Sequence, residues 1–209
     1  MTLTIRKAQI CQAEQAGELL MDTLYGFGTY MTGLGSRERG IKALSDYFRL
    51  PGNRFSYQYS YIATVDEETA GLLLIFPGSM FTKLSNIMLR QMLKVYSFGE
   101  ILETIRRSVV LRDEEEVQKD ELYIAHLSVF PKFQRRGIGQ ALLDFAEKKA
   151  LESGIRKLSL MAESENAGAI RLYRNFGFQV VKTFEHPHQI PLTGSPAYVR
   201  MVKELKHQE

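Results

Sequence analysis

The sequence lacks the features that mark secreted or membrane-spanning proteins. Its 209 residues include one cysteine, Cys11, which excludes an internal disulfide framework and which we expect to be a small, partly buried apolar residue. No apolar run approaches the length of a membrane span, and residues 1–7 have no apolar signal core. We therefore expect a cytoplasmic protein with no membrane partner.

The chain also has little excess of positive over negative charge. The net charge is +3, from 27 Lys and Arg against 24 Asp and Glu, and the two signs are interspersed along the chain. A basic stripe of the kind that binds nucleic acid is missing, so no nucleic-acid partner is expected. The apolar content of 44% is that of a globular protein with a real core, and the length fits one domain over residues 1–209.

The most informative segment is residues 127–143, where an apolar strand runs through a basic turn directly into an amphipathic helix. The first N–H groups of a helix have no intrahelical partner, and the helix dipole places partial positive charge there. Gly137 and Gly139 have no Cβ, so a ligand can approach the backbone closely. This layout predicts a site for a phosphate or pyrophosphate.

Two motifs in this region resemble the GNAT superfamily of N-acetyltransferases. The order Gln134-x-x-Gly137-x-Gly139 after a strand resembles its acyl-CoA-binding turn. Residues 166–178 resemble its Asn-x-x-Ala-x-x-Leu-Tyr-x-x-x-Gly-Phe element, and a strand-like stretch at 157–161 lies between the two. The close resemblance covers about residues 121–180, and the rest of the chain fits by the order of its elements.

The resemblance implies a fold of the α/β (α+β) class: a mixed, mostly antiparallel sheet of about six or seven strands flanked by helices, with a splayed strand pair at the cofactor cleft. Residues 78–120 contain two apolar stripes at helical spacing where the family layout has a short turn, which predicts a helical insertion. The insertion and a predicted glycine-rich loop at 25–35 should wall the acceptor site. A packing role for the insertion, or a homodimer contact, is the open alternative.

The implied activity is acetyl-CoA-dependent N-acetylation of a primary amine of a small molecule or peptide, by direct attack. By position, main chain at Leu127 and Val129 would bind the pantetheine, the turn would bind the pyrophosphate, and an N–H near Val129 would stabilise the oxyanion. The full set implied for the cofactor is Leu127, Ser128, Val129, Gln134, Arg135, Arg136, Gly137, Ile138, Gly139, Gln140, Asn166, Ala169 and Tyr173.

Tyr173 is the implied general acid, because the family often places a tyrosine hydroxyl near the thioester sulfur at this position. The base is harder to assign, since the matching positions on the strand hold no carboxylate or histidine. His126 is the titratable neighbour, but strict alternation turns it away from the face of Val129 unless a bulge intervenes. Glu121, at the start of the strand, could act as the base through a water molecule.

Particular residues favour or oppose two other interpretations, a CoA-binding module without catalysis and a metal site. A catalytically inactive CoA-binding regulatory or interaction module would explain the missing carboxylate base, although Tyr173 and Asn166 argue against it. His186 and His188 have a spacing that occurs in metal sites, but no Cys or carboxylate cluster supports them, so no metal is expected.

Overall fold

The computed structural model describes residues 2–109, 117–185, 190 and 194–205. The strands are β1 (Leu3–Lys7), β2 (Ser60–Val65), β3 (Glu68–Pro77), β4 (Leu122–Val129), β5 (Lys157–Glu163), β6 (Gln179–Glu185) and β7 (Ala197–Glu204). The α-helices are α1 (Ala13–Phe27), α2 (Arg37–Arg49), α3 (Phe81–Val95), α4 (Phe98–Ser108), α5 (Ile138–Glu152) and α6 (Ala167–Asn175).

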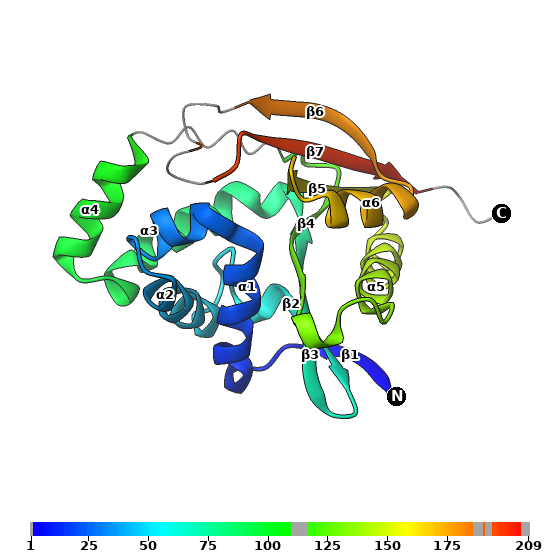
Figure 1. Cartoon of the computed structure of the whole chain (residues 1–209), viewed down its shortest axis with the longest axis horizontal. Helices are drawn as coiled ribbons and strands as arrows, with labels where there is room; N and C mark the ends of the chain where they lie inside the picture. Colours follow the sequence, from blue (N-terminus) through cyan, green and yellow to red (C-terminus); the bar gives the residue numbers. More distant parts are fainter. Residues whose placement is uncertain (1, 110–116, 186–189, 191–193, 206–209) are drawn as a thin grey trace.

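The strands form one sheet in the order β1-β2-β3-β4-β5-β7-β6 (Figure 1). All neighbouring strands run antiparallel except β4 and β5, which are parallel. The predicted mixed, mostly antiparallel sheet is thereby confirmed. A parallel pair needs a long crossover connection, and here α5 supplies it.

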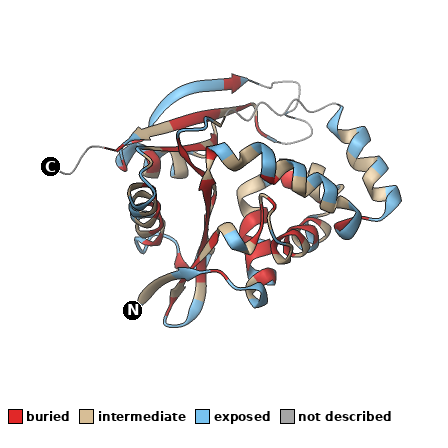
Figure 2. Cartoon of the chain, turned by 180° about the vertical axis from the view of Figure 1, so that it is seen from behind, coloured by how far each residue is buried: buried red, intermediate tan, exposed pale blue. Residues whose placement is uncertain are grey.

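Helices cover both faces of the sheet. Figure 1 shows α5 and α6 on one side and α1 to α4 on the other. Each side has its own apolar core: Leu142 and Ala146 of α5 lie in one, and Leu20 of α1 and Leu44 of α2 lie in the other. In β3, residues 70–76 are buried without interruption, because a central strand between two helix layers has no solvent face. Figure 2 shows this buried band running through the middle of the molecule.

Local capping signals start two of the helices. Ser36 accepts a hydrogen bond from the backbone N–H of Arg39 at 3.1 Å, and Asn166 accepts one from the N–H of Ala169 at 3.0 Å. Both contacts satisfy an N–H that the first helical turn leaves without a partner. Both helices therefore begin directly after a residue whose side chain caps them.

Two local predictions were wrong. Cys11 is exposed rather than partly buried. The segment at 25–35 is largely helical: α1 kinks at Tyr25 and runs into a π-helical turn, Gly28–Thr32. A Cβ at Gly28 would lie 2.7 Å from the Leu24 side chain, and one at Gly33 would lie 2.0 Å from a backbone oxygen, so these glycines serve close packing rather than loop flexibility.

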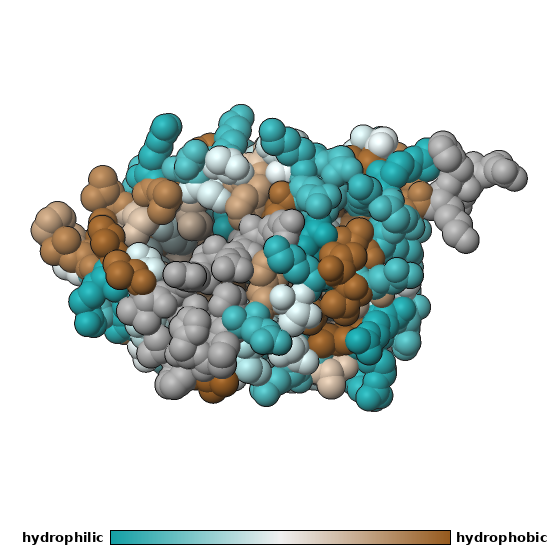
Figure 3. All heavy atoms as spheres, turned by 90° about the horizontal axis from the view of Figure 1, so that it is seen from above, coloured by the Kyte–Doolittle hydropathy of each residue, from teal (hydrophilic) through white to brown (hydrophobic). Residues whose placement is uncertain are grey.

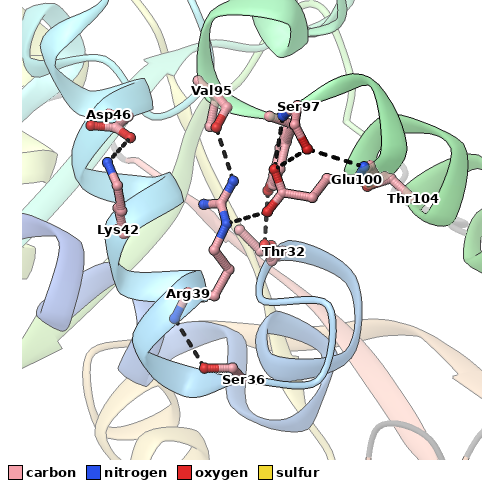
Figure 4. A network of polar contacts seen from close by, with 10 residues as sticks. Thr32, Ser36, Arg39, Lys42, Asp46, Val95, Ser97, Glu100 and Thr104 are labelled. Atoms are coloured by element: carbon pink, nitrogen blue, oxygen red, sulfur yellow. Dashed lines mark hydrogen bonds and ion pairs between the residues drawn. The ribbon is translucent and has the colours of Figure 1, made fainter.

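The region 78–120 contains both predicted helices, α3 and α4, and residues 110–116 lie outside the described part. Figure 4 shows how they are tied to α2: the Arg39 guanidinium donates to Glu100 at 2.6 Å and to the Val95 carbonyl at 2.9 Å. Ser97 and Glu100 form a reciprocal cap at the start of α4. The insertion is thus fixed to the α1–α2 side of the sheet.

The outer face of α4 is apolar. Phe98 and Leu102 of α4, and Val109 directly after it, are all largely exposed, and Figure 3 shows apolar side chains gathered at this end of the molecule. A dimer contact there stays a prediction. Among the described residues, no helix has the length and apolar character that crossing a bilayer requires.

Candidate active site

The cleft forms where β4 and β5 separate. The two strands pair only at residues 122–124 of β4 with residues 158–160 of β5, and within the described chain the later residues of each strand do not pair with the other. A cavity of about 1410 Å³ occupies this region. Its walls come from β4, β5, α1, the start of α5, α6 and the insertion. The predicted splayed pair is therefore present.

A β-bulge in β4 decides which side chains face which wall. Leu74 pairs with His126 and Ile75 with Ile124, so Ala125 is the extra residue. Beyond the bulge, Leu127 and Val129 pack on the α5 side of the sheet. Because the bulge lies before His126, it does not bring that side chain to the face of Val129. His126 instead faces the α1–α2 side.

The turn after β4 is built as an anion site. The Gln134 side chain donates to the Val129 carbonyl at 2.9 Å, and Arg135 and Gly137 have positive φ values of 62° and 79°. Gly137 is the N-cap of α5, no side chain caps the helix, and its first turn contains no acidic residue. The N–H groups of the first turn and the positive end of the helix dipole therefore face the cavity with no acidic side chain in that turn to compete for an anion.

The structure brings most of the predicted cofactor residues to the cavity wall. Those that line it are Leu127, Ser128, Val129, Gln134, Arg135, Gly137, Ile138, Gly139, Gln140, Asn166, Ala169 and Tyr173. Arg136 does not line the cavity, and its guanidinium lies over the Phe133 ring, 5.7 Å from the ring centre. Cofactor binding by each of these residues stays a prediction.

Tyr173 and Asn166 lie together with Tyr25, a residue that the motifs did not indicate. The Asn166 amide donates to the Tyr25 hydroxyl, which joins α6 to the kink of α1. Tyr173 is buried and packs edge-on against Phe178. Burial, reinforced by Tyr25, raises the pKa of Tyr173, so its hydroxyl keeps its proton and can act as a donor.

His126 is held as a neutral imidazole. The Thr23 hydroxyl donates to the Leu20 carbonyl at 2.7 Å, so it accepts the proton of His126 Nδ1 at 2.6 Å, and Nε2 keeps its lone pair. The ring stacks on Phe55. Burial, and secondarily the Arg54 charge, lowers the pKa of His126 to about 3. His126 is therefore a weak base, although it lines the cavity.

The structure does not bring Glu121 to the site. Its carboxylate is fully buried, is paired with the Arg200 guanidinium and accepts from the Gln118 N–H at 2.9 Å. It is absent from the cavity wall. Glu121 joins β4 to β7, and this position corrects the hypothesis that it acts as a base through water.

Glu163 is the titratable cavity residue that the motifs missed. It is the last residue of β5 and lines the cavity, where the Tyr198 hydroxyl donates to Oε1 at 3.5 Å. Burial raises the pKa of Glu163 to about 7. The available signal was alternation along β5, which would have placed Glu163 on the same face as Met161.

The insertion supplies one end of the cavity. Met88, Leu89 and Met92 of α3 line it together with Thr104 and Ile105 of α4. The predicted loop region also contributes, through Tyr25 and Phe27 among others. Among the described residues there is no group of three or more His, Cys, Asp and Glu side chains placed to hold a metal ion, and His186 and His188 fall outside those residues.

A family model described as "Acetyltransferase (GNAT) family" matches residues 46–178. The chain belongs to this acetyltransferase family. A crystal structure described as an acetyltransferase aligns with 97% of this GNAT chain and with 100% of its own length, at 27% identity and a TM-score of 0.68.

Curated relatives match over shorter segments. The mycothiol acetyltransferase of Propionibacterium freudenreichii is 35% identical over 71 residues, which is 34% of this chain and 22% of that protein. The ribosomal protein bS18-alanine N-acetyltransferase of Escherichia coli K12 is 36% identical over 63 residues, which is 30% of this chain and 43% of that enzyme. The GNAT chain therefore spans about a fifth of the length of the first relative and less than half of the second.

Proposed function

We propose that this protein transfers the acetyl group of acetyl-CoA to a primary amine by direct attack. The observation that carries the proposal is the start of α5: a helix N-terminus with no capping side chain and no acidic residue, facing a cavity between splayed parallel strands. Membership of the acetyltransferase family supports the same chemistry.

The residues present fit the diphosphate of acetyl-CoA. A Cβ built on Gly137 meets nothing within 4 Å, so the space in front of the turn is open to a ligand. N–H groups of Ile138, Gly139 and Gln140 would bind phosphate oxygens, and the Arg135 side chain adds positive charge. On the other wall, the unpaired edge of β4 offers main-chain groups to an extended ligand such as pantetheine.

The catalytic steps fall to groups already in the cleft. Direct attack needs a neutral amine, a donor for the oxyanion and a proton for the departing thiolate. A backbone N–H near Val129 would stabilise the oxyanion. The Tyr173 hydroxyl, kept protonated by its buried position, would protonate the thiolate. His126, neutral at physiological pH, would orient the acceptor by accepting a hydrogen bond at Nε2.

We propose that the acceptor carries its amine on an apolar body. The insertion end of the cavity is lined by Met88, Leu89, Met92 and Ile105, and methionine side chains adapt to irregular shapes. This assignment makes the insertion, about residues 78–120 of a single domain, the wall that selects the acceptor. The two curated relatives differ in their named acceptors, so we keep both small-molecule and peptide amines as candidates.

The competing proposal is a CoA-binding module without catalysis. The missing carboxylate on β4 motivates it, and the cavity position of Tyr173 opposes it. The test is incubation of the protein with acetyl-CoA and a panel of amines, with free CoA thiol measured by a colorimetric reagent and the product by mass spectrometry. Acetylated amine with stoichiometric thiol supports transfer. Acetyl-CoA binding by calorimetry without thiol release for any amine would favour the module.

A further inference from the structure

We infer that Glu163 takes the proton of the attacking amine, an inference that rests on the proposed acetyl transfer. The positions of β4 that face the cofactor offer no carboxylate, and the nearest carboxylate beside that strand, Glu121, is paired with Arg200 outside the cavity. Glu163 reaches the cavity from the opposite wall of the cleft, at the end of β5.

The pleat of β5 sets the direction of Glu163. Leu158, Leu160 and Ala162 pack in the core on the α5 side, and Met161 packs in the core on the α1–α2 side. Because side chains alternate along a strand, Glu163 lies on the same side as Met161. After the bulge in β4, the His126 side chain also lies on this side of the sheet. Glu163 and His126 therefore line opposite walls of one cleft on the same side of the sheet.

Three groups of the described chain act on the Glu163 carboxylate, and none of these three is a cation. Tyr198 of β7 donates to its carboxylate, Tyr25 of α1 interacts with it electrostatically, and Glu165 of the connection to α6 adds a like charge. Loss of solvation contributes most to the raised pKa of about 7, the Tyr198 hydrogen bond opposes the rise, and Glu165 adds to it. The carboxylate is therefore about half ionised at neutral pH, the range in which a general base works best.

His126, the other candidate base, is the weaker of the two. The pKa of His126 is about 3 and that of Glu163 is about 7. Burial disfavours the charged form of each group, so it makes His126 the poorer and Glu163 the better acceptor of the amine proton. The two residues can divide the work, with the Nε2 lone pair of His126 orienting the amine and Glu163 removing the proton.

The step balances in atoms and charge. The amine nitrogen forms a bond to the thioester carbonyl carbon, and its proton passes to the Glu163 carboxylate, directly or through one water molecule. The carbon–sulfur bond breaks, and the thiolate takes the hydroxyl proton of Tyr173. The products are the amide and free CoA thiol. Glu163 then releases its proton to solvent, and Tyr173 regains one.

The test compares Glu163→Gln with Glu18→Gln, which removes an exposed carboxylate of α1 that does not line the cavity and should leave kcat and its pH profile as in wild type. In wild type, kcat should fall about tenfold per pH unit below the pKa of the base, near pH 7. Glu163→Gln should lose this acid limb and about 10²–10³-fold of kcat, with unchanged acetyl-CoA affinity. Glu163→Asp should restore part of the rate. An unaltered pH profile in Glu163→Gln would overturn the inference.

A second measurement separates this inference from the proposed function. Carbon NMR of the Glu163 side chain, assigned by its loss in Glu163→Gln, gives the carboxyl pKa without any acceptor. A value near 7 supports a poised base, and a value near the ordinary glutamate pKa of about 4.3 overturns it. Failure of wild type to release thiol with any amine would instead refute the proposed transfer, whatever the NMR titration gives.

Discussion

The two ends of α5 provide a matched test of the anion site. Gly137 precedes the helix and Gly154 follows it, with φ values of +79° and +72°. A Cβ built on either residue meets nothing within 4 Å. Gly137→Ala and Gly154→Ala therefore impose the same backbone strain on the same helix without a steric clash. Gly137 lines the cavity, and Gly154 does not.

The expected effect on stability is the same for both variants. An alanine in the left-handed region costs about 1–2 kcal/mol. In a chain of this size, each kcal/mol lowers the melting temperature by about 2–4 °C, so both variants should melt about 2–8 °C below wild type. Thermal denaturation followed by circular dichroism measures this shift and shows that both proteins remain folded.

The effect on ligand binding should differ. In Gly137→Ala, the methyl group enters the open space through which a phosphate would approach the helix N–H groups. Loss of one charge-assisted hydrogen bond costs about 1.5–3 kcal/mol, which weakens acetyl-CoA binding by roughly 10–100-fold. Calorimetric titration measures this change, and Gly154→Ala should bind like wild type. Equal affinities for the two variants would refute the anion site at this turn.

Three further changes test the rest of the cleft. Tyr173→Phe should lower turnover by about 10²–10⁴-fold with little change in acetyl-CoA affinity, and equal turnover would make Tyr173 a packing residue. Met92→Gln should raise the KM for amines that carry an apolar group and should leave acetyl-CoA binding unchanged. The control Leu93→Gln, on the exposed side of α3, should change neither quantity. A loss of oligomer mass in light scattering with unaltered kinetics would instead assign the insertion to a subunit contact. Glu121→Gln should lower the unfolding free energy in urea by on the order of 3 kcal/mol, because it breaks a buried ion pair with Arg200, and a stable but inactive variant would contradict its structural role.

Features of the fold that depend on neighbours in sequence could be predicted from the sequence. Ser36 and Asn166 each cap a helix through a bond three residues away, which spacing alone indicates. The strand, turn and helix around Gly137 form one continuous segment, so its glycines and basic residues indicated the anion site directly. The two helices of the insertion followed from their apolar stripes because an amphipathic helix repeats within a few residues.

Features that depend on distant segments could not be predicted in this way. Glu121 is separated from Arg200 by 79 positions, and the sequence alone does not show that β4 and β7 bring the two together. The glycines at 28 and 33 looked like loop residues because their use in packing α1 against its surroundings is visible only in three dimensions. Glu163 carried no motif signal, since its raised pKa arises from burial and from the charge of Glu165.

The cleft is assembled from parts that are held independently. The turn before α5 depends on β4 and on the Gln134–Val129 contact, whereas the insertion is fixed to α2 through Arg39 and Glu100. The hydrogen bond from Arg39 holds the pKa of Glu100 at about 2, so this tie remains charged at physiological pH. The two ends of the cavity thus have separate supports in the structure. Mutations in α3 and α4 can then alter the acceptor end of the cavity while the N–H groups that face the diphosphate stay in place. We therefore expect acceptor choice and acetyl-CoA affinity to respond to different mutations.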